Sequence, residues 1–239
     1  MSTASVLGVV TARGGSRALP RKNILPLAGK PVIAYTIEAS HGCDLIDRVI
    51  VSTDDEEIAE VARTWGAEVP FIRPAELATD TAHHPDVMQH AVAFIEAEQD
   101  SPVDLVLTLQ PTSPLRTADH LRQGIERIRQ TGAGCLVSVR EACFPPFWMF
   151  AAKGDRLKTF VEHDVDYFTL ERQQLPRVYQ ANGAVYVTRR DILMEGNKLV
   201  VPEDIAYIVM DEESSLEIDT ALEFRLIELI LNEWRQDEA

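Results

Sequence analysis

A short apolar run near the N-terminus, Val6 to Val10, has the length and character of a strand buried in a parallel sheet. The run breaks abruptly into the glycine pair Gly14-Gly15. Glycine permits a positive φ and a close approach of the backbone, so a loop of this kind can wrap a phosphate with its N–H groups. The stretch therefore favours an α/β fold in which the glycine loop follows the first buried strand.

Four cations crowd into ten residues of this loop: Arg13, Arg17, Arg21 and Lys22. The chain as a whole has a net charge of −15, so the loop reverses the local sign of the charge. Such a reversal suits a polyanion such as a nucleoside triphosphate, and a solvated basic loop is the alternative. The loop is neither a Walker A motif nor G-x-G-x-x-G.

Apolar runs and amphipathic segments alternate along the rest of the chain. Strands are predicted at 47–53, 68–72, 103–109, 134–140, 180–187 and 206–210, and helices at 32–39, 56–62, 85–98, 119–129 and 222–235. This alternation makes a parallel sheet with right-handed crossovers the default architecture. At 239 residues the chain can form one large α/β domain, or one domain with an appendage.

The alternation fails between Glu141 and Arg172. Aromatic side chains are concentrated there beside a proline pair: Phe144, Phe147, Trp148, Phe150 and Phe160. An aromatic excursion from a regular sheet is either a flap over the substrate or a contact between subunits. We favour the subunit contact.

Composition excludes several classes of protein. No run of about 18 apolar residues exists, so no membrane span is predicted, and the N-terminus lacks the pattern of a signal peptide. The cysteines, Cys43, Cys135 and Cys143, are widely spaced and indicate neither a disulfide framework nor a zinc site. A cytoplasmic protein is expected, and its acidity argues against nucleic acid as the main partner.

Polar segments follow three of the predicted strands, at 12–23, 52–55 and 110–116. In open α/β sheets, ligands bind outside the carboxyl ends of the strands. We therefore expect these three segments to meet around one site.

Paired carboxylates offer candidate metal ligands. Glu217 and Asp219 are two residues apart, so in extended backbone they project to the same side, where they can hold Mg²⁺. A solvated strand edge or a helix N-cap is the alternative, and for Asp54-Asp55 we favour N-capping. His83-His84 can contact metal or a phosphate, but a plain loop is favoured.

Several blocks of sequence together resemble the cytidylyltransferases that activate sialic acids and related nine-carbon sugars. The segment from Ala12 to Asn23 resembles the signature loop of that family. Further blocks occur in the family's order along the whole chain, at 51–54, 73–78, 109–116, 182–186 and 218–220.

The resemblance implies a three-layer, Rossmann-like nucleotidyltransferase fold with a mostly parallel sheet. It implies a single domain over 1–239, with a dimerisation extension at 141–172 and a homodimer as the assembly. The implied reaction joins CMP from CTP to the anomeric 2-hydroxyl of a nonulosonic acid, with Mg²⁺ as cofactor and pyrophosphate as the second product.

The resemblance also implies roles for individual residues. The nucleotide would be held by Ala12, Arg13, Gly14, Ser16, Lys22 and Asn23, with Arg73 and the backbone near Ala82 at the cytosine. The acceptor would be held by Gln110, Arg172, Asn182 and Tyr186. Asp219 and Glu217 would bind the metal, and Arg13, Lys22 and Asp219 would be catalytic.

Three departures from the family pattern bear on the metal and the acceptor. The family commonly has D-I-D where this chain has Glu217-Ile218-Asp219, so Glu217 is expected to reach the metal through water. The segment 145–148 replaces one that carries a lysine in some sialic acid members, and 196–199 lacks an aromatic pair. These departures point away from N-acetylneuraminate and leave legionaminate, pseudaminate, an octulosonate or a phosphonate open.

Overall fold

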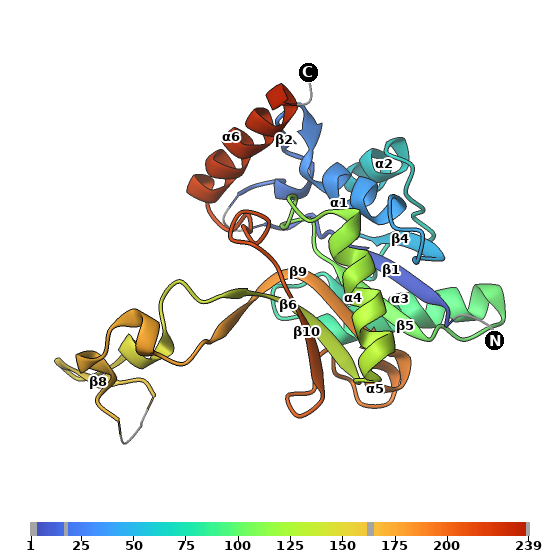
Figure 1. Cartoon of the computed structure of the whole chain (residues 1–239). Coiled ribbons are helices and arrows are strands. Elements are labelled where there is room, and N and C mark those ends of the chain that lie inside the picture. The colour runs from blue at the N-terminus through green and yellow to red at the C-terminus, as the bar shows by residue number, and fades with distance from the viewer. Residues whose placement is uncertain (1–3, 17–18, 162–164, 238–239) are drawn as a thin grey trace.

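The fold is centred on one mixed sheet. The computed structural model describes residues 4–16, 19–161 and 165–237. Its six-stranded sheet has the order β10-β6-β9-β5-β1-β4 (Figure 1). The strands are β1 (Val6–Thr11), β4 (Arg48–Ser52), β5 (Leu105–Leu109), β6 (Cys135–Glu141), β9 (Tyr179–Arg189) and β10 (Ile205–Val209). β9 runs antiparallel to β5 and β6, and the other pairings are parallel, so the expected mostly parallel sheet is confirmed.

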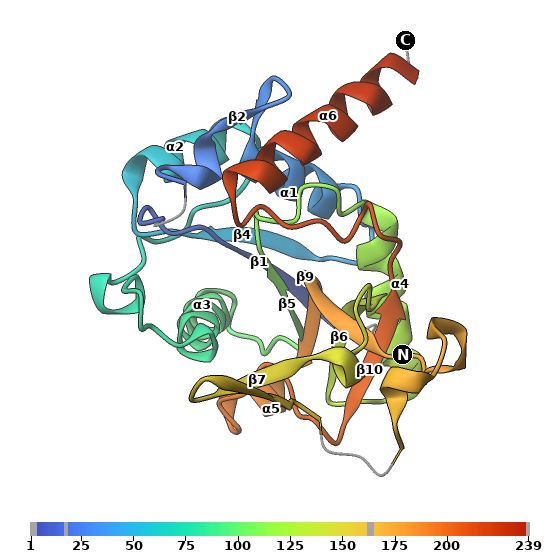
Figure 2. The same cartoon turned by 90° about the vertical axis from the view of Figure 1, so that its left-hand side faces the viewer.

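Helices cover both faces of the sheet and make three layers (Figure 2). One face carries α1 (Val32–His41), α2 (Glu56–Thr64) and α4 (Ala118–Thr131). The other carries α3 (His84–Gln99) and the short α5 (Arg190–Met194). The last helix, α6 (Ala221–Asp237), packs through Ile227 and Leu231 on the start of α1 and on the small hairpin of β2 (Pro26–Leu27) and β3 (Lys30–Pro31).

The first strand shows why the N-terminal run is apolar without interruption. Val6 and Val10 of β1 pack into the core under α1, α2 and α4, whereas Leu7 and Val9 pack under α3. A strand buried on both faces needs apolar side chains at successive positions rather than at alternate ones. The predicted buried strand is confirmed.

The predicted strand at 68–72 is wrong. This segment makes only isolated bridges to β4, Ile50 with Glu68 and Thr53 with Ile72. Pro70 lies between the two bridges and has no N–H to donate, so a continuous ladder cannot form across it. The five residues of α5 were not predicted, because one turn and a half is too short to show a helical period.

The excursion after β6 forms an arm that projects from the body of the molecule (Figure 1). We use "arm" for residues 142–178. It contains the hairpin of β7 (Phe150–Lys153) and β8 (Arg156–Thr159) and three short 3-10 turns, at 146–148, 167–169 and 172–174. Within it, Phe150 stacks on Phe168 with a centroid distance of 5.3 Å.

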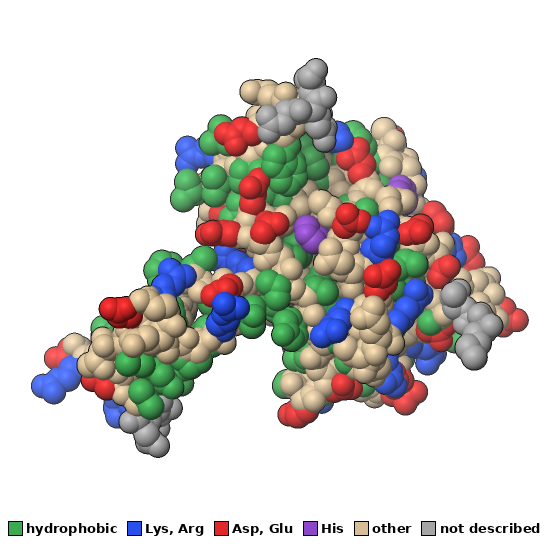
Figure 3. Space-filling view, viewed as in Figure 1, with side chains coloured by type: hydrophobic (Ala, Val, Ile, Leu, Met, Phe, Trp, Pro, Cys, Tyr) green, Lys and Arg blue, Asp and Glu red, His purple; other side chains and the backbone are tan. Residues whose placement is uncertain are grey.

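Apolar side chains remain on the surface of the arm (Figure 3). Phe144 is 77% exposed, and Leu157 and Phe160 are each 67% exposed. Exposed apolar side chains in such density are typical of contact surfaces. Elsewhere in the described chain, no helix combines the length and the apolarity that a membrane crossing requires.

Candidate active site

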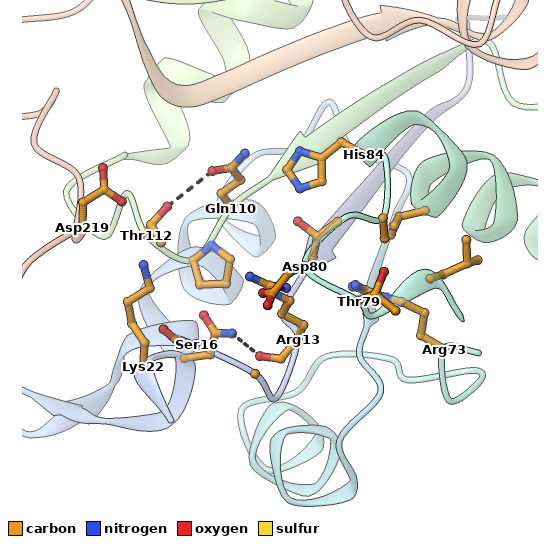
Figure 4. Close-up of a pocket in the computed structure, with 17 residues that line it drawn as sticks. Arg13, Ser16, Lys22, Arg73, Thr79, Asp80, His84, Gln110, Thr112 and Asp219 are labelled. Carbon is orange, nitrogen blue, oxygen red and sulfur yellow. Dashed lines mark hydrogen bonds and ion pairs between the residues drawn. The ribbon is translucent and has the colours of Figure 1, made fainter. Parts of the chain in front are cut away.

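A cavity of about 450 Å³ opens at the carboxyl ends of β1 and β5 (Figure 4). It is lined by Thr11, Arg13, Gly15, Ser16, Lys22, Asn23, Arg73, Leu77, Thr79, Asp80, Ala82, His84, Val87, Gln110, Pro111, Thr112 and Asp219. Segments 12–23 and 110–116 therefore meet there, as expected. The third segment, 52–55, lies behind the lining and supports it through the contacts described below.

The glycine loop forms one wall of the cavity and is fastened at several points. Arg13 forms an ion pair with Asp80 at 2.8 Å, and its carbonyl oxygen accepts a hydrogen bond of 2.9 Å from Asn23 Nδ2. The N–H of Gly14 donates to Asp54 Oδ1 at 2.9 Å. These contacts tie the described part of the loop to its neighbours.

Neither Gly14 nor Gly15 adopts the positive φ that glycine permits. The expected close approach is found at Gly14, but toward the protein itself. A Cβ there would lie 2.6 Å from Asp55 Oδ2. Since the Gly14 N–H is taken by Asp54, it does not face a phosphate.

The four cations of the loop have different surroundings. Arg13 and Lys22 line the cavity, whereas the Arg21 guanidinium pairs with Asp55 and Glu57 away from it. Arg17 lies outside the described residues. Lys22 Nζ donates to the carbonyl oxygen of Ile218 at 2.6 Å.

Burial lowers the pKa of the Lys22 ammonium, and the nearby carboxylates of Asp219 and Glu217 oppose that shift. Two positive groups, Arg13 and Lys22, thus line the cavity, and Asp219 lies at the same end of it as Lys22. This distribution suits a ligand that is itself negative and carries a cation.

Arg73 is a buried cation at the end of the cavity opposite Lys22 (Figure 4). Its Nε donates to Ser52 Oγ at 3.0 Å, and its Nη2 donates to the carbonyl oxygen of Ser52. Burial lowers its pKa to about 10, so it stays protonated at neutral pH. Two hydrogen bonds to the end of β4 hold this guanidinium in one orientation.

The two paired motifs of uncertain role are now placed. Asp55 Oδ1 accepts from the N–H of Ile58 at 3.0 Å, so the predicted N-cap of α2 is confirmed. His84 is the first residue of α3 and lines the cavity, so the plain-loop interpretation is wrong for it. Burial, then the neighbouring Arg73 and Arg13, lowers the pKa of His84, which keeps the imidazole neutral at pH 7.

A second wall of the cavity follows β5. Gln110 and Thr112 line it, and Thr112 Oγ1 lies 3.5 Å from Gln110 Oε1. Behind them Arg116 is buried, donating to the carbonyl oxygen of Ala184 at 2.6 Å, to Thr36 Oγ1 at 2.6 Å and to the carbonyl oxygen of Gln110 at 3.3 Å. This guanidinium ties the end of β5 to β9 and α1, a role that the sequence did not reveal.

The paired carboxylates lie on either side of the buried Ile218. The N–H of Ile218 donates to the carbonyl oxygen of Thr112 at 2.8 Å, which fastens the segment 217–219 beside the second wall. Asp219 lines the cavity, and Glu217 is half-buried behind it, against Gly183. Burial raises the pKa of Glu217 to about 7, and the negative charge of Asp219 adds to the shift. The two carboxylates are therefore close enough to interact, although only Asp219 lines the cavity, and their joint hold on a metal stays a prediction.

Besides Gly14, five of the predicted residues lie outside the lining, and two of these five are occupied within the protein. Ala12 is in the core, and its N–H donates to the carbonyl oxygen of Ser52 at 3.1 Å. The buried Asn182 donates from Nδ2 to Ser215 Oγ at 2.8 Å and accepts from Ser138 Oγ at Oδ1. Its side chain supports the segment before Glu217 instead of facing the cavity.

The other members of that group are Tyr186, Arg172 and Glu217. Tyr186 is half-buried on β9, where burial and then Glu217 raise its pKa. Arg172 belongs to the arm and lines a separate hollow of about 360 Å³ with Glu141 and Arg177. Its contact with an acceptor stays a prediction.

Sequence reasoning missed part of the lining, namely Thr11, Leu77, Thr79, Asp80 and Val87. Several of these belong to the irregular loop that leads into α3. Such a loop has no period, so its only signal is its place after a strand end.

Comparison with known proteins agrees with the geometry. The sequence model of the family described as "Cytidylyltransferase" matches residues 7–220. The CMP-N,N'-diacetyllegionaminic acid synthase of Legionella pneumophila is 35% identical, over 95% of this chain and 96% of the relative. The pseudaminic acid cytidylyltransferase of Campylobacter jejuni is 33% identical, over 92% of this chain and 94% of the relative.

A solved structure shares the fold. The CMP-2-keto-3-deoxy-manno-octonic acid synthetase, solved in complex with CTP, superposes with a TM-score of 0.69. It covers 96% of this chain and 99% of its own length, at 17% sequence identity. The chain belongs to the cytidylyltransferase family and is an enzyme of that class, with the Rossmann-like fold that its sequence led us to expect.

Proposed function

We propose that this enzyme joins CMP from CTP to the anomeric 2-hydroxyl of a nonulosonic acid and releases pyrophosphate. The observation that carries the proposal is the cavity lined by Arg13, Lys22, Asp219 and Gln110 together. The full-length similarity to synthases of CMP-legionaminic acid and cytidylyltransferases of pseudaminic acid supports the same reaction.

The reaction follows from the charges around the cavity. The acceptor hydroxyl oxygen forms a bond to the α-phosphorus of CTP, and the bond from that phosphorus to the oxygen of the leaving pyrophosphate breaks. The hydroxyl proton passes to solvent. Phosphoryl-type transfer depends on positioning and charge neutralisation, and Arg13 and Lys22 are placed to stabilise the charge on pyrophosphate.

The carboxylate pair fits a magnesium ion. Asp219 and Glu217 offer hard oxygen donors, and the raised pKa of Glu217 reflects a buried negative charge beside another, which a cation relieves. Asp219 would hold the ion directly and Glu217 through water. When bound, Mg²⁺ would neutralise charge on the phosphate oxygens.

At the opposite end of the cavity, Arg73 would recognise the cytosine with the backbone near Ala82. Its guanidinium is already oriented by Ser52, so little freedom is lost on binding. The neutral His84 lies between this end and Gln110, where an uncharged donor and acceptor suits a hydroxyl-bearing sugar.

Among acceptors we favour a legionaminate-type acid over N-acetylneuraminate. The departures at 145–148 and 196–199 point away from the latter, and the similarity to the Legionella pneumophila synthase points to the former. An octulosonate is the alternative. Its support is the fold alone, since that relative shares 17% identity.

We also propose that the enzyme is a cytoplasmic homodimer joined through the arm. The apolar side chains of Phe144, Leu157 and Phe160 are exposed on the arm, and a second copy would cover them. Cys43, Cys135 and Cys143 are free thiols, which suits a reducing compartment.

Pyrophosphate release tests the reaction. The enzyme should turn over with CTP, Mg²⁺ and at least one nonulosonic acid from a panel that includes legionaminate, pseudaminate, neuraminate and an octulosonate. ATP, GTP and UTP serve as controls and should support little turnover. Absence of turnover with every nonulosonic acid would refute the proposed function, and exclusive use of the octulosonate would select the alternative.

Asp219→Asn should lower kcat by at least about a hundredfold, because the amide cannot replace the carboxylate at the metal. The free energy of unfolding should stay within about 0.5 kcal/mol of the wild-type value, since Asp219 is exposed. Glu213→Gln, in the exposed turn before the carboxylate pair, is the matched control. Equal activity of the Asp219 variant and this control would remove the metal assignment.

Glu217 should make stability depend on pH in EDTA. Its pKa is about 7 in the folded protein against 4.5 ordinarily, so the folded state binds this proton more tightly. This contribution to the free energy of unfolding is fully present below about pH 4.5 and is lost as the pH rises through about 7. Glu217→Gln should flatten the free energy of unfolding over this range, as measured by urea denaturation. An unchanged slope would contradict the shift.

The arm interface can be tested by light scattering. Phe144→Ser combined with Phe160→Ser should raise the dimer dissociation constant by at least about tenfold. The substitutions remove two exposed apolar side chains that the second copy would cover. Leu229→Ser on α6 is the control, as its side chain is similarly exposed, at 63%. A dimer disrupted by the control instead would move the interface from the arm to α6.

A further inference from the structure

We propose that Arg21 is a positioning residue, held by Asp55 and Glu57, that aims Lys22 and Asn23 into the cavity. The consequence for substrate binding rests on the proposed function, because the ligand of that wall is then the triphosphate of CTP. The consequence for the loop itself does not depend on it.

The backbone at Arg21 is the first reason. Arg21 has φ 58° and ψ 25°, in the left-handed region that residues with a side chain adopt rarely. It immediately precedes the short 3-10 turn Lys22–Ile24, so its conformation sets the direction in which that turn leaves the loop. Lys22 and Asn23, the next two residues, both line the cavity.

The contacts of the Arg21 side chain hold the backbone in this unfavourable conformation. Its Nη2 donates to Asp55 Oδ1 at 3.0 Å, its Nη1 donates to Asp55 Oδ2, and Nη2 also pairs with Glu57. A two-pronged pair between guanidinium and carboxylate specifies orientation as well as attraction. It accordingly raises the pKa of Arg21 and lowers that of Asp55.

Asp55 is a rigid point of attachment. Its Oδ1 caps α2 by accepting from the N–H of Ile58, and its own N–H donates to Thr53 Oγ1 at 3.2 Å. Arg21 is thereby anchored to the junction of β4 and α2, which belongs to the core of the fold.

The same junction holds the other end of the loop. Asp54 Oδ1 accepts from the N–H of Gly14, and Gly14 packs against Asp55 with no room for a Cβ. The adjacent carboxylates of Asp54 and Asp55 thus fasten the loop where it leaves β1 and again where it ends at Arg21. Arg13 and Lys22, each next to one of these points, are held facing the cavity.

We call the ion pairs of Arg21 with Asp55 and Glu57 the clamp, and we expect it to affect the position of the loop more than the stability of the fold. The ion pair is partly exposed, and exposed ion pairs contribute little to the free energy of unfolding. A displacement of the group that binds substrate, in contrast, is costly for binding. The clamp is therefore expected to act on the nucleotide and on the local backbone.

Three variants separate the ion pair of Arg21 from its backbone conformation and from the N-cap of α2. Arg21→Ala removes the pair and leaves the unfavourable backbone. Arg21→Gly removes the pair but accepts the left-handed conformation. Asp55→Ser keeps an N-cap for α2 and removes the carboxylate. Arg48→Ala is the matched control, because Arg48 pairs with Glu68 at 2.7 Å and Glu98 at 2.8 Å and does not line the cavity.

Hydrogen exchange of the peptide covering 19–27 reads the loop directly. The N–H groups of Lys22, Ile24 and Leu25 donate to backbone carbonyls in this turn and should be protected in the wild type. Exchange should be faster in Arg21→Ala and Asp55→Ser, and unchanged in Arg48→Ala. Unchanged exchange in the first two variants would overturn the proposal, whatever the enzyme binds.

Steady-state kinetics with CTP tests the consequence for substrate binding. Arg21→Ala and Asp55→Ser should each raise KM for CTP by about tenfold and leave KM for the acceptor within about twofold. Arg21→Gly should fall between the alanine variant and the wild type. The double variant should be no worse than either single one, because both remove the same pair. An additive double variant, or equal effects on both substrates, would contradict the clamp.

Discussion

The arrangement of the active site depends on the register of β1 between its two neighbours. Thr11 pairs with Ser52 of β4, and Val10 pairs with Leu109 of β5, so the three strands end at the same level. The loops that follow them must meet there, and they supply the wall with Arg13 and Lys22, the junction behind it and the wall with Gln110 and Thr112. Since β1 is buried on both faces, a slip of one residue would exchange its two sets of core side chains.

Much of this fold could be predicted because burial on both faces leaves a plain signal in the sequence. The apolar run of β5 contains no polar residue other than Thr108, and it was predicted as a strand for that reason. The segment 68–72 has a similar composition, but Pro70 interrupts its pairing. The antiparallel direction of β9 has no local signal, because it follows from where the arm returns the chain.

The site was predictable where chemistry is concentrated in short motifs, as at Arg13, Lys22 and Asp219, all of which line the cavity. It was not predictable where a side chain acts across the fold. Arg116 bonds to β9 and α1 from the loop after β5, and Asp80 reaches Arg13 from an irregular segment. Asn182 shows the converse, since a motif of the family placed it near the acceptor, but its hydrogen bonds join β6 to the segment that carries Glu217.

The topology of the arm has a consequence for how such an enzyme can diversify. The arm leaves the sheet at Glu141 and returns at Tyr179, two residues that pair with each other across β6 and β9. An insertion whose two ends are already joined by a strand pair places no demand on the remaining core. Its length and its side chains are therefore free to change, while the register that assembles the cavity stays the same.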